Sequence, residues 1–269
     1  MNKNITIAGL GWLGQPFAAA LIKQGYIVKG SVTDATKAKT LSTQGFEAHK
    51  VLLTEAGTTG ALTTFLKDTD VLAIMIPPGL RRNTGTNYAL KMAHFLHEIE
   101  ASQIKKVILV SSTAVYDDSQ GLVTEKIRPN PQSNASKQLY DVEQIFFNTT
   151  SFECSIVRFG GLYGGNRNPV RFLAGRKGLN NGEAPVNLIH REDCIGILMA
   201  IIKQDAFGHI FNAVTPQHPT KKEYYTKQAA ILGLEPPHYE KKEDEDVFKQ
   251  IDSVNVDGVL SYEFVHSLM

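Results

Sequence analysis

The stretch Gly9-Leu10-Gly11-Trp12-Leu13-Gly14 decides how this chain folds. It has the spacing G-x-G-x-x-G, follows the apolar run of residues 5–8, and precedes a segment of helical periodicity at residues 13–24. In such a loop the first glycine permits a tight turn, the second lets the backbone approach a pyrophosphate, and the third lets the helix pack on the strand. Free N–H groups of the helix N-terminus face the anion. The stretch therefore predicts a Rossmann-type βα unit that binds a dinucleotide through Gly9, Gly11, Trp12, Leu13 and Gly14.

Short apolar runs alternate with segments of helical period along the first 160 residues. This alternation predicts an α/β fold with a doubly wound parallel sheet and right-handed crossovers. After about residue 160 the rhythm breaks at a glycine-rich segment. We therefore expect a Rossmann domain at 1–160, completed by about 191–212, and a smaller C-terminal α/β substrate-binding lobe at 161–190 and 213–269. The predicted strands are residues 5–8, 27–32, 47–51, 71–76, 107–111, 155–159 and 209–212, and the predicted helices are 13–24, 36–43, 61–66, 86–100, 136–147 and 193–202.

Composition excludes several classes of partner. The net charge of +1 is spread over 28 basic and 27 acidic residues, so nucleic acid is not expected as a partner. The longest apolar run, residues 71–76, is far shorter than the roughly 20 residues of a membrane helix, and the chain opens on a strand pattern without a signal peptide. The two cysteines show no metal-ligand spacing, so we expect buried thiols, no metal and a cytoplasmic protein with a small-molecule substrate.

The choice of cofactor is read at the end of the second strand, Gly30-Ser31-Val32-Thr33-Asp34. Ser31 and Thr33 offer hydroxyls to a phosphate, and Lys37 and Lys39 follow, which favours NADP over NAD. Asp34 leaves the choice open, because it is placed either to bind the ribose of NAD or to cap the next helix. The alternative is that residues 9–14 form a glycine-rich turn that binds no cofactor. A plain turn would not require three glycines at these positions, each of which costs conformational entropy on folding.

Two families share this opening. Residues 9–45 resemble the start of the β-hydroxyacid dehydrogenases, which carry a helical second domain. Motifs along nearly the whole chain resemble the extended short-chain dehydrogenase/reductases, also called the NAD-dependent epimerase/dehydratase family. Ser111-Ser112-Thr113-Ala114-Val115-Tyr116-Asp117 is similar to that family's SS(S/T)xVYG segment. Further similar segments are Arg158-Phe159-Gly160-Gly161-Leu162-Tyr163-Gly164-Gly165, Asn187-Leu188-Ile189-His190-Arg191-Glu192-Asp193, Gly208-His209-Ile210-Phe211-Asn212 and Ile251-Asp252-Ser253.

This second resemblance implies a reaction centre. Ser112 matches the catalytic hydroxyl, and Lys137 matches the lysine of the family's Tyr-x-x-x-Lys, but Ser133 stands where the tyrosine is expected. An aliphatic hydroxyl is a much weaker acid than a phenol, so the usual proton transfer is in doubt, while Lys137 still suits the nicotinamide ribose. Tyr163, in a glycine-rich loop, is the alternative phenol.

The same resemblance places other residues around the cleft. Ser111, at the end of the fifth predicted strand, and Pro77, after the fourth, are expected beside the cofactor, and the prolines at 77 and 78 suggest an atypical pocket. The helices at 86–100 and 136–147 are those that commonly pair in a homodimer. The candidate substrate ligands are Arg167, Arg171, Asn187 and His190, with Arg81, Arg82 and Arg176 as further loop arginines near the cleft.

The sequence thus leaves three functions open. The first is an NAD(P)-dependent oxidoreductase or epimerase on a small polar or nucleotide-sugar-like substrate. The second is a catalytically silent dinucleotide-binding sensor or regulator, which the serine at position 133 favours. The third is a β-hydroxyacid dehydrogenase, which strands in the second half would eliminate.

Overall fold

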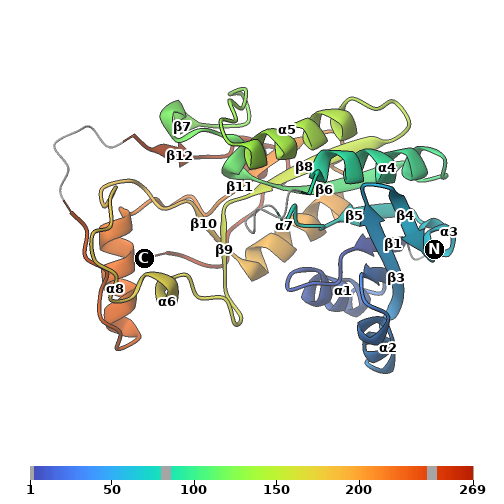
Figure 1. Ribbon diagram of the computed structural model, residues 1–269, viewed down its shortest axis with the longest axis horizontal. Coiled ribbons are helices and arrows are strands. Elements are labelled where there is room, and N and C mark those ends of the chain that lie inside the picture. The colour runs from blue at the N-terminus through green and yellow to red at the C-terminus, as the bar shows by residue number, and fades with distance from the viewer. Residues whose placement is uncertain (1–2, 80–85, 241–246, 269) are drawn as a thin grey trace.

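A central sheet of eight strands organises the computed structural model, which describes residues 3–79, 86–240 and 247–268 (Figure 1). The strand order is β11-β8-β6-β5-β1-β2-β3-β4, and every neighbouring pair is parallel except β3 and β4. The predicted α/β class with a parallel sheet is therefore confirmed. The strands are β1 (Asn4–Ala8), β2 (Ile27–Val32), β3 (Glu47–Thr54), β4 (Gly57–Gly60), β5 (Val71–Ile74), β6 (Lys106–Ser112), β8 (Glu153–Phe159) and β11 (Ile210–Ala213).

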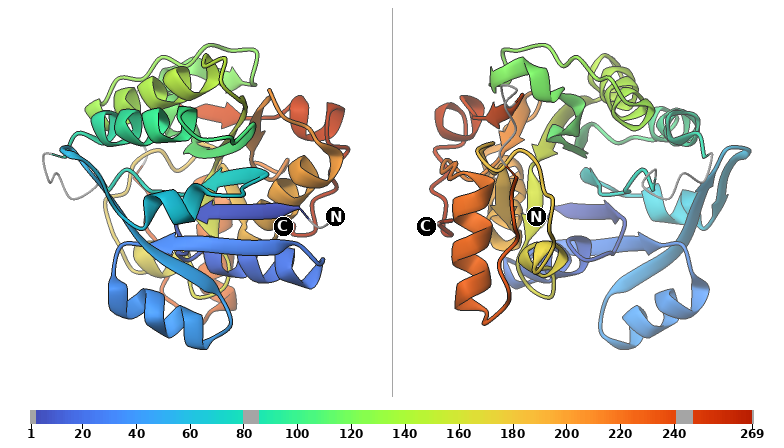
Figure 2. Two further views of the ribbon diagram at one scale, coloured as in Figure 1. Left: turned by 90° about the vertical axis from the view of Figure 1, so that its right-hand side faces the viewer. Right: turned by 60° about the vertical axis from the view of Figure 1, so that its left-hand side comes forward.

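Helices cover both faces of this sheet. In Figure 2 the blue helices α1 and α2 lie on one side and the green helices α4 and α5 on the other. Each layer closes its own core: Phe17 and Ile197 belong to the core beneath α1, α2 and α7, whereas Phe95 and Phe146 belong to the core beneath α3, α4 and α5. The helices are α1 (Gly14–Lys23), α2 (Ala35–Thr43), α3 (Leu62–Leu66), α4 (Tyr88–Glu100), α5 (Asn134–Phe147) and α7 (Arg191–Gln204).

The chain reverses its direction of travel across the sheet at β1. β2 lies on one side of β1 and β5 on the other, so the connections that leave these two strands diverge. In open α/β sheets such a switch point leaves a crevice outside the carboxyl ends of the strands, where ligands bind. The loop after β1, residues 9–14, opens into that crevice.

The second half of the chain adds small elements to the far end of the molecule, where α6 and α8 lie well away from β3 (Figure 1). Two parallel strand pairs, β9 with β10 and β7 with β12, lie outside the main sheet. Because this half contains strands, the β-hydroxyacid dehydrogenase alternative is wrong. The remaining elements are β7 (Gly121–Val123), β9 (Gly161–Tyr163), β10 (Leu188–His190), β12 (Lys249–Ile251), α6 (Val170–Leu173), α8 (Lys221–Ile231), α9 (Asn255–Gly258) and the 3-10 turns η2 (Thr113–Val115) and η3 (Asp118–Gln120).

Among the helices described, none combines the length and the apolar character that crossing a bilayer requires.

Candidate dinucleotide site

The three glycines of the loop after β1 have three different surroundings. Gly9 has φ of +115°, and a Cβ there would lie 2.9 Å from the carbonyl oxygen of Met75. A Cβ on Gly14 would lie 2.1 Å from the carbonyl oxygen of Gly9, so this glycine lets α1 start against the strand. A Cβ on Gly11 would meet nothing within 4 Å. Gly9 and Gly14 therefore serve the fold, whereas Gly11 faces open space where a ligand can approach.

The loop also presents amide groups that the described chain leaves without acceptors. The N–H of Leu10 donates to the carbonyl of Ser31 at 2.7 Å, and that of Gly11 donates to Gly9 at 2.8 Å. The next three N–H groups, those of Trp12, Leu13 and Gly14, have no acceptor in the part of the chain described here, and α1 has no side-chain cap. Three free donors at a helix N-terminus form an anion site, which a pyrophosphate would fill.

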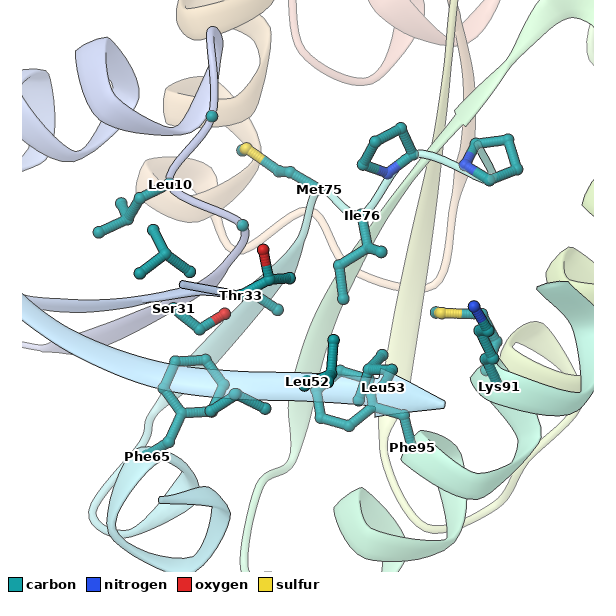
Figure 3. Close-up of a pocket in the computed structure, with 18 of the residues that line it drawn as sticks. Leu10, Ser31, Thr33, Leu52, Leu53, Phe65, Met75, Ile76, Lys91 and Phe95 are labelled. Atoms are coloured by element: carbon teal, nitrogen blue, oxygen red, sulfur yellow. The ribbon is translucent and has the colours of Figure 1, made fainter. Parts of the chain in front are cut away.

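A cavity of about 410 Å³ extends from this loop across the ends of β2, β3 and β5 to α4. Figure 3 shows side chains of β3 and α4, including Leu52, Leu53 and Phe95, facing it together with Leu10. Its described lining contains the cations Lys37 and Lys91 but no carboxylate. The full lining is Ala8, Gly9, Leu10, Gly11, Ser31, Val32, Thr33, Lys37, Val51, Leu52, Leu53, Phe65, Met75, Ile76, Pro77, Pro78, Tyr88, Lys91, Met92 and Phe95.

The sequence leaves two roles open for Asp34, ribose binding and helix capping, and the structure shows the second. Its carboxylate accepts the backbone N–H of Lys37 at 2.8 Å and so caps α2. Ser31, Thr33 and the side chain of Lys37 line the cavity instead. The edge that would face the ribose therefore carries hydroxyls and an ammonium group. Pro77 also lines the cavity, at the end of β5.

The predicted reaction centre lies where α5 packs against β6 and η2. The hydroxyl of Ser112 accepts the N–H of Ala114 at 3.2 Å, which starts η2 at the end of β6. Ser133 is the N-cap of α5: its hydroxyl accepts the N–H of Ser136 at 3.1 Å. Lys137 is exposed one turn later, and its ammonium makes no hydrogen bond or ion pair with the described residues. Ser133 thus has a structural duty, while Lys137 is free to bind a ligand.

Ser111 faces the opposite way from its neighbour. Its buried hydroxyl donates to Glu143 at 2.6 Å, and Glu143 in turn forms a buried ion pair with Arg158 at 2.6 Å. Arg158 also donates to the hydroxyl of Tyr116 at 2.6 Å. The side chain of Ser111 is therefore committed to this buried network rather than to a cofactor. Alternation along β6 is the physical reason, because successive side chains of a strand point to opposite faces.

Tyr163 lies at the end of β9, opposite His190 of β10. The two rings meet edge to face with centroids 5.0 Å apart, and the phenol oxygen is buried without a hydrogen-bond partner among the described residues. Burial, with Asp193 as a further cause, raises the pKa of Tyr163 to about 12. A catalytic phenol needs the opposite shift, so this placement argues against Tyr163 as the alternative catalytic phenol.

The four candidate substrate ligands do not form one cluster. Arg167 lies over the ring of Trp12, with 4.4 Å between the guanidinium carbon and the ring centroid. Arg171 is exposed on α6. The amide of Asn187 is used by the fold, because it donates to the carbonyl of Lys249 at 2.8 Å and accepts the N–H of Ile251 at 2.8 Å. Arg81 and Arg82 lie outside the described residues.

The fourth candidate for substrate binding, His190, caps α7. Its ring stacks on that of His266, with ring centroids 3.6 Å apart and planes at 29°. Together with Glu192 these residues bring ligand atoms within 4.8 Å of one another, a grouping that sequence spacing does not show. Nδ1 of His190 accepts the N–H of Glu192 at 3.3 Å, and nearly parallel rings do not point two lone pairs at one ion. The cluster is therefore a histidine stack at a helix start.

Sequence reasoning missed two cations of the site. Lys91, on α4, lines the cavity. The guanidinium carbon of Arg191 lies 5.4 Å from the centroid of the Trp12 ring. Arg191 directly follows His190 and lies within the family-like segment 187–193, but the resemblance gave Arg191 no role in the site. Nothing in the sequence places Lys91 near β2, because that contact depends on how α4 packs.

Comparisons with solved structures agree with the fold. UDP-glucuronic acid 4-epimerase from Bacillus cereus, solved with UDP-glucuronic acid and NAD, has a TM-score of 0.79 at 19% identity, covering 98% of this chain and 95% of that one. A short-chain dehydrogenase/reductase superfamily protein from Agrobacterium tumefaciens with bound NAD has a TM-score of 0.76 at 17% identity, covering 98% and 93%.

The similarity to a sequence relative also covers nearly the whole chain. Protein YeeZ of Escherichia coli K12 is 34% identical over 268 residues, which is 97% of this chain and 96% of that protein. The family model described as NAD(P)H-binding matches residues 9–205, which begin at the first glycine of the loop and end after α7. This chain belongs to the NAD(P)H-binding family.

Proposed function

We propose that the protein binds NADP(H) with the pyrophosphate on the free amides of Trp12, Leu13 and Gly14. The observation that supports the proposal is the position of these amides directly after Gly11, which lines a cavity of about 410 Å³ that is large and apolar enough for an adenine. Ser31 and Thr33 at the end of β2, with Lys37 in the first turn of α2, would hold the 2′-phosphate, while one carboxylate oxygen of Asp34 caps the helix. When bound, the dinucleotide supplies or accepts a hydride.

Cofactor choice is tested by titrating the protein with NADPH and NADH in a calorimeter. We expect tighter binding of NADPH, because a charge-assisted hydrogen bond to phosphate contributes about 1.5–3 kcal/mol. Lys37→Met should weaken NADPH about tenfold and leave NADH unchanged. Lys39→Met is the matched control, since Lys39 is on the same helix but not in the cavity lining. Equal affinities for both cofactors, unaffected by Lys37→Met, would contradict the NADP preference.

The reaction that we propose is oxidoreduction or epimerisation of a small polar or nucleotide-sugar-like substrate. Ser112 would donate its hydroxyl to the substrate oxygen, and the free ammonium of Lys137 would bind the nicotinamide ribose. The test is a screen of keto compounds and nucleotide sugars, with NADPH absorbance for reduction and product chromatography for epimerisation. Ser112→Ala and Lys137→Met should each reduce any turnover found by about 100-fold or more. Turnover that neither variant changes would reject these roles.

A silent sensor is the second candidate, and the capping role of Ser133 favours it. A hydroxyl that caps α5 is no substitute for a phenol whose pKa is lowered by lysine. Ser133→Tyr separates the two candidates. Turnover that appears only in this variant supports a natural binding protein, whereas turnover in the wild type rejects the sensor.

A further inference from the structure

Two arginines of the second half converge on the glycine loop of the first. The guanidinium carbons of Arg167 and Arg191 lie 4.4 and 5.4 Å from the centroid of the Trp12 ring. The indole N–H of Trp12 donates to the side-chain oxygen of Asn166 at 3.0 Å. Trp12 lies inside the G-x-G-x-x-G stretch, and its own backbone N–H is one of the three free donors.

The local backbone is shaped to make this approach. Gly164 and Arg167 close a tight turn through two backbone hydrogen bonds, of 2.9 and 3.0 Å, which places Gly165 and Asn166 at its tip and Arg167 at its base. Gly165 has φ of +58°, and a Cβ there would lie 2.5 Å from a terminal nitrogen of Arg191. The left-handed backbone at position 165 favours glycine, and the missing side chain leaves room for the guanidinium of Arg191, the first residue of α7.

The charges of this cluster are not balanced by the described chain. Neither Arg167 nor Arg191 has an ion pair with any described carboxylate. The Nε of Arg191 is buried and has no acceptor among the same residues. Attraction to the indole face offsets part of the repulsion between two guanidiniums, but it does not satisfy their N–H groups. An anion held between the arginines and the loop amides would satisfy both.

We infer that Arg167 and Arg191 form a clamp on the diphosphate of the bound dinucleotide. The clamp rests on the proposed function, and it adds that the second half of the chain contributes directly to cofactor affinity. A guanidinium pairs with phosphate oxygens through two parallel N–H bonds, which suits it to a diphosphate. Trp12 then serves as the surface on which both arginines are positioned.

Trp12 is the single tryptophan of the chain, so its fluorescence reports on this cluster alone. Titrations with NADPH should change that fluorescence and give a dissociation constant. Arg167→Met and Arg191→Met should each weaken NADPH binding about tenfold and make the affinity less dependent on salt. The double variant Lys177→Met/Lys203→Met removes two exposed positive charges from the same half and should bind as the wild type does. Circular dichroism confirms that each variant is folded.

Two further probes separate this inference from the proposed function. Unchanged NADPH affinity in both arginine variants would overturn the clamp while dinucleotide binding stands. A selective loss of UDP-glucose binding would also overturn it, because the diphosphate would then belong to a substrate. If the wild type binds inorganic pyrophosphate at Trp12, lost in the arginine variants, but no dinucleotide, the anion clamp survives and the proposed cofactor fails. If the wild type binds neither pyrophosphate nor NADPH, both the clamp and the proposed function are rejected.

Discussion

At the scale of single residues, the glycines at positions 11 and 14 have opposite duties within one motif. A Cβ at Gly14 would collide with backbone at 2.1 Å, whereas a Cβ at Gly11 would meet no atom within 4 Å. The fold therefore requires glycine at position 14 but not at position 11, where we propose that the bound ligand requires it. Stability and affinity measurements separate them.

We predict that Gly14→Ala lowers the free energy of unfolding by about 1–3 kcal/mol, because the added Cβ would lie 2.1 Å from the carbonyl oxygen of Gly9 and force the backbone to shift. Gly11→Ala should change it by less than about 1 kcal/mol. Urea denaturation without ligand measures both. Equal losses of stability would contradict this division of roles.

The buried pair of Glu143 and Arg158 gives a second residue-scale prediction. Arg158→Met leaves the Glu143 carboxylate buried without its cation, and we expect a loss of about 3–5 kcal/mol in the free energy of unfolding. The double variant Glu143→Leu/Arg158→Met should lose less than the single one, because no unpaired charge remains. A larger loss in the double variant would show that the pair stabilises by more than mutual neutralisation.

The sequence predicted the loop glycines well, and it predicted the remaining site residues unevenly. Local spacing determines Gly9 to Gly14, since neighbours in the chain form the turn. The environment of Ser111 and the reach of Arg191 depend on contacts with Glu143 and Trp12, far away in the chain. Spacing carries no information about such contacts.

At the scale of elements, helix starts explain much of what polar residues do here. Asp34, Ser133 and His190 each cap a helix, although each was also a candidate for chemistry. The helix α8 went unpredicted because its apolar pattern is weak. Its signal was the capping box that Thr220 and Glu223 form.

Strand ends were predicted less accurately than strand existence. The apolar run at residues 71–76 predicts a strand to residue 76, but β5 ends at Ile74, before the two prolines, which donate no backbone hydrogen bond. β4 was missed, because its two terminal glycines and two threonines lack an apolar face. The short strands β7, β9, β10 and β12 gave no periodic signal either.

The cap of α7 makes a pH-dependent prediction. Burial, then the neighbouring His266, lowers the pKa of His190 below the ordinary histidine value of about 6.5. Between that lowered pKa and pH 6.5 the unfolded chain binds the proton more readily, so stability falls as the pH drops through this window and is fully present above it.

Urea denaturation at pH 8 and pH 5.5 tests this effect. His190→Asn keeps a capping side chain and should show a smaller acid-induced loss of stability than the wild type. His97→Asn, an exposed position on α4, is the control and should lose as much as the wild type. The same loss in the His190 variant would contradict the assignment.

At the scale of the whole molecule, α4 and α5 pack side by side on one face of the sheet. Leu90 and Ile145 leave exposed apolar surface on these helices, at 39% and 37% of their area. We expect the two helices to pair with those of a second copy. Light scattering after size exclusion should give twice the chain mass of 29.6 kDa, and Leu90→Glu/Ile145→Glu should restore that single mass. A single mass for the wild type would contradict the dimer.

The first half supplies the loop amides, and the second half brings arginines to the same loop. A ligand bound here would contact segments more than 150 residues apart in the chain and would stabilise their packing. The hydrogen bond between Trp12 and Asn166 already joins the same two segments. The sequence predicted both halves, but their meeting at Trp12 follows only from the packing of α7 against α1.

Calorimetric titration of the wild type and of Gly11→Val with NADPH tests whether the loop at residues 9–14 holds a dinucleotide. A valine at position 11 fills the space beside the free amides without touching the fold. We expect saturable one-to-one binding to the wild type and its loss in the variant, with unchanged unfolding midpoints. No binding to the wild type, or equal binding to the variant, would show that the loop at residues 9–14 does not hold a dinucleotide.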